Sequence, residues 1–183
     1  MKLKFRLARQ DDLLCLVSLI NRAYRSGGAK SWTNEAGIVA GQRIDLNQLQ
    51  QALAQPDFEL WLLEHEQADA SELQGCIGLT FNSASAEIGT FCVDPKAQNA
   101  GLGRKLLAFA ESYIQQNHQA SQILEMHVLN VRTELIAFYQ RCGYVQMRKT
   151  ADYPVNANVG QPLLALHLVH LQKERGMQGF AEA

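Results

Sequence analysis

Two glycines, Gly101 and Gly103, stand where a strand-like run gives way to a helix-like run, and this arrangement can bind an anion. The run Glu87–Val93 reads as a strand, and apolar residues with a period of 3.6 begin at Leu102. The unpaired N–H groups of a helix start lie at the positive end of the helix dipole, and glycines let a phosphate approach without a Cβ in the way. The spacing therefore predicts a pyrophosphate site.

Two basic residues, Arg104 and Lys105, fall in the first turn of the same expected helix. Positive charge there is unfavourable to the helix dipole, so the pair is easier to understand if an anion lies in front of it. The alternative is that both side chains simply point to solvent. A Gly-x-Gly pair alone also closes ordinary turns, so the neighbouring elements have to support the site.

The elements that position this segment follow from the periodicity of the apolar residues. Asp11 and Asp12 suit the start of the first expected helix, because they complement its dipole and can cap it. The expected helices cover residues 11–25, 46–56, 102–114 and 133–141, and the expected strands cover 4–9, 58–64, 73–81, 86–93, 123–129, 144–148 and 163–168. The sequence thus predicts an α/β fold with a mixed sheet in a single domain, residues 1–183, with a core from about 3 to 170 and a C-terminal tail over 171–183.

The composition argues against several classes of function. The formal net charge is −1 and the pI is near 6.5, with no long run of one sign, so nucleic acid is not an expected partner. The N-terminus lacks the apolar core of a signal peptide and no run of about 18 apolar residues occurs, so we expect a cytoplasmic protein without a membrane partner. The four cysteines form no Cys-x-x-Cys pair and the histidines show no ligand spacing, so no metal is expected.

The segment from Gln98 to Gly103 resembles the signature Gln/Arg-x-x-Gly-x-Gly/Ala of the GNAT acetyltransferase superfamily, and the order of elements is similar too. A second match is Asn130–Tyr144, which looks like the family's helix ending in Phe-Tyr-x-x-x-Gly-Phe/Tyr. The segment 32–36 resembles the Trp-Thr-x-Glu-Ala segment of one subgroup. The resemblance implies a mainly antiparallel sheet flanked by helices, with acetyl-CoA as co-substrate. It also implies direct transfer of the acetyl group to an amine of a small molecule or peptide.

The resemblance also assigns the residues that would hold coenzyme A. Its pyrophosphate would bind the glycine loop, and its pantetheine would pair with the end of the preceding strand. The residues so assigned are Phe91, Cys92, Val93, Gln98, Asn99, Ala100, Gly101, Leu102, Gly103 and Arg104 from the first match, and Asn130, Arg132, Leu135 and Phe138 from the second. The family usually has an asparagine seven residues before its tyrosine, where this chain has Arg132, so either Asn130 or Arg132 makes that contact.

Acyl transfer from a thioester requires a neutral amine, donors for the developing oxyanion and a proton for the leaving thiolate. By resemblance, Tyr139 is the general acid; the alternative is a core aromatic whose hydroxyl is satisfied locally. If strand 86–93 separates from strand 123–129, backbone N–H groups near Cys92 and Val93 could hold the oxyanion. A covalent route through Cys92 is disfavoured because no basic partner is evident.

The amine also needs a base or a water chain, because an alkylammonium is almost wholly protonated at neutral pH. Glu87 is the first candidate, since its spacing before Gln98 resembles that of the glutamate base in the histone-acetylating branch. The alternative places Glu87 on a solvated strand face. Glu35 and His127 are the reserve candidates.

The resemblance implies that the acceptor binds under the segment between the first two helices, where Trp32, Glu35 and Arg43 could bind a polar amine. Tyr153 lies in the loop 153–162, which is either a second wall of the site or a homodimer contact. A rival interpretation keeps the coenzyme site but makes the protein an acetyl-CoA sensor or structural subunit without turnover. A dinucleotide site is disfavoured, because no third glycine follows Gly103.

Overall fold

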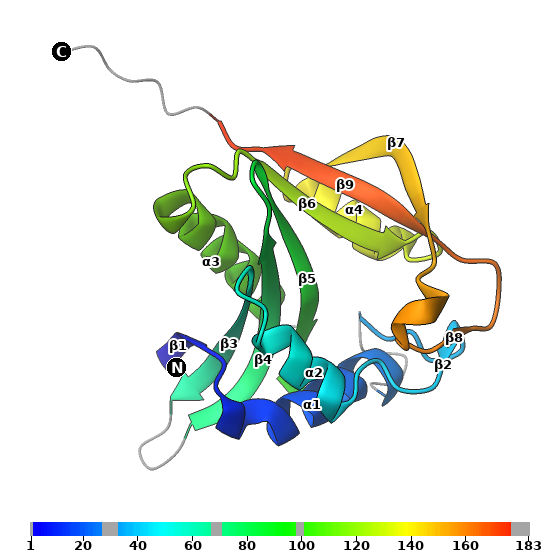
Figure 1. Cartoon of the computed structure of the whole chain (residues 1–183), viewed down its shortest axis with the longest axis horizontal. Coiled ribbons are helices and arrows are strands. Elements are labelled where there is room, and N and C mark those ends of the chain that lie inside the picture. The colour runs from blue at the N-terminus through cyan, green and yellow to red at the C-terminus, as the bar shows by residue number, and fades with distance from the viewer. Residues whose placement is uncertain (1, 27–32, 67–70, 98–100, 177–183) are drawn as a thin grey trace.

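A computed structural model describes residues 2–26, 33–66, 71–97 and 101–176 of the chain, and a seven-stranded sheet forms its centre (Figure 1). The strand order is β1-β3-β4-β5-β6-β9-β7, and of these neighbours only β5 and β6 run parallel. The strands are β1 (Lys2–Leu7), β3 (Phe58–Glu66), β4 (Ser71–Phe81), β5 (Ser85–Val93), β6 (Ile123–Leu129), β7 (Val145–Asp152) and β9 (His167–Glu174). The predicted mixed sheet, mainly antiparallel, is confirmed.

Four α-helices flank the sheet: α1 (Leu13–Asn21), α2 (Leu46–Leu53), α3 (Leu102–Asn117) and α4 (Thr133–Arg141) in the described part of the chain. A π-helical turn over Arg22–Ser26 extends α1. Two short strands, β2 (Val39–Ala40) and β8 (Gln161–Pro162), pair with each other and join the segment after α1 to the loop before β9. The sequence did not predict this small ribbon.

Alternation along the strands produces two apolar cores on opposite faces of the sheet. Leu62 and Cys76 pack with α1 and α2 on one face, while their neighbours Leu63 and Ile77 pack with α3 and α4 on the other. Strands β3, β4 and β5 are therefore buried on both faces, and the two cores hold β5 in place from both sides.

The parallel strands β5 and β6 pair over only three residues each, Ser85–Glu87 and Ile123–Glu125. Figure 1 shows them close together at one end and far apart at the other. A register shift in the β4–β5 ladder coincides with Thr90, whose φ is +44°. A β-branched residue with positive φ is uncommon and marks a bulge that bends the strand away from its neighbour. The sheet is thus split beside Glu87, as the oxyanion hypothesis requires.

Several expected boundaries are wrong. Strand 163–168 does not exist as predicted, because Leu163 and Leu164 are exposed loop residues and β9 begins only at His167. The sheet also continues past the expected core boundary, since β9 runs to Glu174 and Leu171 is fully buried. The sequence of β9, HLVHLQKE, does not indicate a strand clearly, because only Val169 and Leu171 are buried and most of its other residues are polar.

Asp12 is the N-cap residue of α1, but its side chain makes no capping hydrogen bond to this helix, and a short 3₁₀ turn over Gln10–Asp12, which contains Asp11, comes first. The Asp12 carboxylate accepts hydrogen bonds from both Nη atoms of Arg6 at 2.7 and 2.8 Å and from the backbone N–H of Arg9 at 2.7 Å. Arg6 also donates to Glu64 of β3 at 2.6 Å. The Asp12 carboxylate therefore binds the Arg6 guanidinium and the start of the 3₁₀ turn instead of the N–H groups of α1.

We expect Asp12→Asn to destabilise the protein at neutral pH by about 1–2 kcal/mol. The Arg6 hydrogen bond, with further help from Arg9, holds the pKa of Asp12 below its ordinary value of 3.8 in the folded state. A carboxyl with a depressed pKa contributes stability above its unfolded pKa and loses it as the pH falls through its folded pKa. Urea unfolding at a series of pH values should therefore show a difference in stability between wild type and variant at pH 7 that shrinks as the pH falls below 3.8. A difference that stays constant as the pH falls would contradict this role.

Candidate functional site

A cavity of about 240 Å³ lies where β5 and β6 separate. Residues of both strands line it, including Glu87 and Phe91 from β5 and His127 from β6. The start and inner face of α4, the segment that follows α1, and the loop after β7 complete its walls. The further lining residues that matter below are Tyr24, Glu35, Arg43, Arg132, Leu135, Tyr139 and Tyr153. The split in the sheet thus brings together residues from the two halves of the sequence.

Tyr139 reaches this cavity from α4 with its side chain almost wholly buried, at 6% exposure. Its ring packs near Phe91, with centroids 6.3 Å apart. In the described residues its hydroxyl has no hydrogen-bond partner, which argues against the alternative of a locally satisfied core tyrosine. Burial raises the pKa of Tyr139, so the phenol keeps its proton at neutral pH.

Glu87 and His127 meet on the wall of the cavity formed by the two diverging strands. His127 Nδ1 lies 3.1 Å from Glu87 Oε1, and the two side chains are 29% and 43% exposed. Glu87 is thus partly solvated, as its alternative role has it, but its carboxylate also has a defined partner and lines the cavity. It also brings a reserve candidate for the base, His127, into contact with the first candidate.

The helix start of the predicted pyrophosphate site is present at α3. Gly101 precedes the helix with φ +69° and ψ 14°, a left-handed conformation that favours glycine. No side chain among the described residues caps α3, so its first N–H groups remain suited to an anion. Arg104 is exposed beside them. The expected contacts Gln98, Asn99 and Ala100 lie outside the described residues.

Three of the expected coenzyme residues have side chains in the cores. Cys92, Val93 and Leu102 are buried to 2% exposure or less, so they could contact a coenzyme only through their backbone. Cys92 Sγ lies 3.6 Å from Cys76 Sγ under α1 and faces away from the cavity. The covalent route through Cys92 therefore has no support in the structure.

Of the two candidates for the coenzyme contact, Asn130 and Arg132, only Arg132 lines the cavity. Asn130 Oδ1 accepts from the backbone N–H of His167 at 3.1 Å, which ties this side chain to the start of β9. Arg132 lines the cavity and donates from Nη1 to the carbonyl of Asn34 at 2.6 Å. Leu135 also lines the cavity, whereas Phe138 packs against the core beside it.

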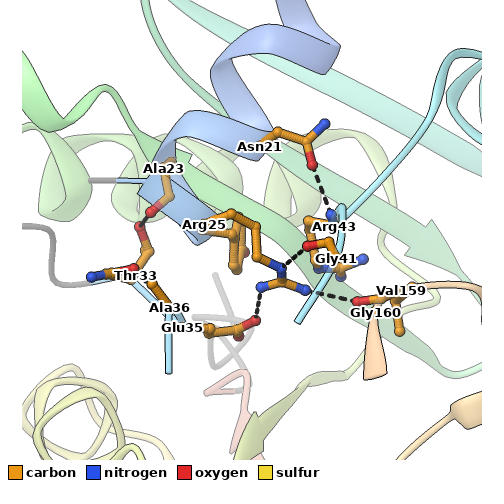
Figure 2. A network of polar contacts seen from close by, with 12 residues as sticks. Asn21, Ala23, Arg25, Thr33, Glu35, Ala36, Gly41, Arg43, Val159 and Gly160 are labelled. Atoms are coloured by element: carbon orange, nitrogen blue, oxygen red, sulfur yellow. Dashed lines mark hydrogen bonds and ion pairs between the residues drawn. The ribbon is translucent and has the colours of Figure 1, made fainter. Parts of the chain in front are cut away.

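Figure 2 shows how Arg25 joins three segments beside the wall of the cavity to which Glu35 and Val159 belong. Its Nη1 donates to Glu35 Oε2 at 2.5 Å, its Nε to the Gly41 carbonyl at 2.9 Å and its Nη2 to the Val159 carbonyl at 2.7 Å. The side chains of Arg25 and Glu35 are only 11% and 14% exposed. The expected acceptor residue Glu35 is therefore paired within the protein and lines the cavity as one half of an ion pair.

Aromatic side chains complete this side. Tyr24 donates its hydroxyl proton to the Phe91 carbonyl at 3.0 Å, and its ring lies 5.3 Å from the Arg43 guanidinium carbon. Tyr153 donates its hydroxyl proton to the carbonyls of Val159 and Gly160, which are 3.3 and 3.2 Å away. The loop that carries Tyr153 thus forms a wall of the site, one of its two expected roles. The expected acceptor residue Trp32 lies outside the described residues.

Sequence reasoning missed several residues of this site. Tyr24 lies inside the first expected helix, 11–25, and its spacing carries no sign of a cavity. Arg25 and His170 carried no signal, because their partners are distant in sequence.

Comparisons with known proteins agree with this architecture. The sequence model described as an acetyltransferase (GNAT) domain matches residues 56–146. The structure is similar to the ribosomal-protein-S18-alanine N-acetyltransferase from Escherichia coli, with a TM-score of 0.69, 15% identity, and coverage of 100% of this chain and 99% of that chain. It is also similar to the spermidine N-acetyltransferase from Vibrio cholerae in complex with CoA and spermine, with a TM-score of 0.68, 17% identity, and coverage of 94% and 95%.

A third similar structure is the ribosomal-protein-alanine N-acetyltransferase from Brucella melitensis, with a TM-score of 0.66, 22% identity, and coverage of 94% and 99%. At these identities the similarity establishes a shared fold. No curated protein matches the chain. Within the described residues, no helix is long and apolar enough to cross a membrane.

Proposed function

The chain belongs to the GNAT acetyltransferase family, whose domain covers residues 56–146, and we propose that it transfers the acetyl group of acetyl-CoA directly to an amine of a small molecule or peptide. The observation that carries this proposal is the cavity between β5 and β6. It has at one side the Tyr139 phenol, which has no hydrogen-bond partner in the described part of the chain, and at the other side a Glu–His pair. Acyl transfer between two substrates needs an acid and a base that face one reaction centre from different directions.

The coenzyme would bind from the α3 and α4 side. The start of α3 at Gly101 and Gly103 fits a pyrophosphate, since it offers helix N–H groups, a glycine conformation and no capping side chain among the described residues. Arg132 and Leu135 fit the part of the coenzyme that enters the cavity. The thioester is the activated acyl group that acetyl-CoA supplies.

The chemistry then follows from the charges of the cavity side chains. The ammonium first gives a proton to the Glu87–His127 pair, and the free amine attacks the thioester carbonyl carbon. A C–N bond forms, the C–S bond breaks, and Tyr139 gives its proton to the departing thiolate. The nitrogen releases a second proton, which restores Tyr139, so that one proton leaves to solvent for each amine acetylated.

The side chains on the wall of the cavity next to Arg25 indicate the chemical class of the acceptor. Tyr24 and Tyr153 supply aromatic surface, and Glu87 supplies a carboxylate that attracts a cation, whereas the charge of Glu35 is already compensated by Arg25. Two of the structurally similar proteins are named for acetylating an alanine of a ribosomal protein and spermidine, and both acceptors present an amine. The names of these two proteins support the proposal that the acceptor of this chain is also an amine.

Binding of acetyl-CoA should stabilise the protein by about 2.7 kcal/mol at a concentration one hundred times its Kd, and ATP or NAD should not. Gly101→Val should weaken this stabilisation, because a β-branched side chain disfavours the left-handed conformation that starts α3. Thermal unfolding of both proteins with and without acetyl-CoA measures the difference. Equal stabilisation by ATP would point to a general phosphate site and contradict the proposal.

A further inference from the structure

Four side chains form a continuous row across β5, β6 and β9, and only part of it lies in the cavity. Glu87 contacts His127 at 3.1 Å, and the ring of His127 stacks on that of His170 with centroids 4.8 Å apart and planes 10° apart. His170 Nε2 in turn lies 2.8 Å from Glu125 Oε2. Glu87 and His127 line the cavity between β5 and β6, whereas His170 and Glu125 do not.

The register of the sheet explains this row. Glu87 pairs with Glu125 across β5 and β6, and His127 pairs with His170 across β6 and β9. The intervening residues of β6 and β9 face the core under α4, so the four polar side chains share the other face. Two neighbouring strands therefore hold the imidazole rings side by side, with a carboxylate beyond each ring.

This arrangement couples the charges of the two rings. Two stacked imidazolium ions would repel, so a proton on one ring opposes a proton on the other. The charged groups that face His127 are Glu87 from β5, Glu125 from β6, Lys149 from β7 and the titratable ring of His170 from β9. The hydrogen bond to Glu87 raises the pKa of His127 above its ordinary value, against burial, which lowers it.

The Glu125 carboxylate is held in its charged form at the far end of the row. Burial alone would raise the pKa of Glu125, but hydrogen bonds from Ser85, Gln172 and His170 outweigh burial, and the pKa lies below its ordinary value. A charged Glu125 favours a positive charge on the rings next to it.

We propose that His127 accepts the proton of the amine, that Glu87 orients its ring, and that His170 and Glu125 are positioning residues that set the charge of His127. This inference rests on the proposed acetyl transfer. With Nδ1–H donated to Glu87, the lone pair of His127 Nε2 is left to take a proton from the ammonium nitrogen. The side chain is 29% exposed, so the proton can then leave to water.

A titration of the histidine ring signals by NMR tests the coupling without any substrate. In the wild type, the ring signals of His127 give the reference midpoint. In His170→Phe the stacked neighbour carries no charge and Glu125 loses a partner, so the midpoint of His127 should rise. In Glu87→Gln the midpoint should fall, because the group that raises it is removed. His167→Phe, which removes a histidine from β9 outside this row, is the matched control and should leave the curve of His127 unchanged.

The pH dependence of kcat/KM for acetyl transfer tests the role of His127 as the base. The rate should rise with pH as His127 loses its proton, and in His170→Phe this rise should move to higher pH together with the NMR midpoint. His127→Ala should lose about 100-fold in kcat, and added imidazole should restore part of it.

The results separate the inference from the proposed function. An unchanged His127 curve in His170→Phe would overturn the coupling, and an NMR shift without a matching shift of the rate profile would overturn the role of His127 as base. Absence of acetyl transfer in the wild type with all amines would contradict the proposed function itself, even if the NMR curves move as expected.

Discussion

Tyr139→Phe should lower kcat for acetyl transfer by about 10²–10⁴-fold and leave the affinity for acetyl-CoA nearly unchanged. The substitution removes one hydroxyl group that has no hydrogen-bond partner among the described residues. The ring would keep its packing against Phe91 and Tyr144, with centroids 6.3 and 6.0 Å away. The thiolate would then leave without a proton donor. Steady-state rates of thiol release, together with a calorimetric titration of acetyl-CoA, separate these two effects.

The matched control is Tyr144→Phe, since Tyr144 is also buried but donates its hydroxyl proton to Glu111 at 2.9 Å, away from the cavity. This variant should lose stability by about 1 kcal/mol and retain its kcat. If Tyr139→Phe keeps the wild-type kcat over the whole pH range, Tyr139 is not the proton donor.

Arg25→Ala should destabilise the protein by about 2–4 kcal/mol and raise the KM for the amine more than the KM for acetyl-CoA. The substitution removes three hydrogen bonds and leaves Glu35 without its cationic partner in a nearly buried position. The segment from Glu35 to Gly41 and the loop at Val159 would lose their common anchor (Figure 2). Urea unfolding measures the first effect, and kinetics with each substrate varied in turn measure the second.

Two further variants give this prediction its controls. Lys2→Ala breaks the Lys2–Glu66 ion pair, whose lysine side chain is 81% exposed, and should cause no measurable loss. Arg25→Lys keeps the charge but cannot donate in three directions from one plane, so it should recover only part of the stability. Equal stability of Arg25→Ala and wild type would show that the three segments hold together without this side chain.

The helix and strand pattern could be predicted from the sequence where apolar residues recur with a clear period. The bounds of β6 and α4 agree with the expectation. Gly101 at the start of α3 could be predicted because it follows a strand and precedes a helical period. These features depend on residues close together in sequence, for which local periodicity and glycine conformation are decisive.

The remaining features depend on pairs that are distant in sequence. Arg25 meets Val159 across more than a hundred residues, and Asp12 contacts Arg6 in place of its own helix, so neither contact could be predicted from neighbouring residues. Glu87 and His127 are both candidates for the base, but only their side-chain contact in the folded chain, beside the end of the parallel β5–β6 pairing, shows that they are partners. The stacking of His170 on His127 follows from the register of β9, whose start the sequence did not reveal.

The most direct test of the central claim follows the acetyl group itself. Wild-type protein is incubated with acetyl-CoA that carries an isotope label in its acetyl group and with a panel of amino acids, polyamines, aminoglycosides and peptides. Mass spectrometry should find the label in an amide on an amine nitrogen of at least one acceptor, with an equal amount of free coenzyme A thiol. Acetyl-CoA that binds and stabilises the protein but leaves its label on no amine would contradict the account and favour a binding protein without turnover.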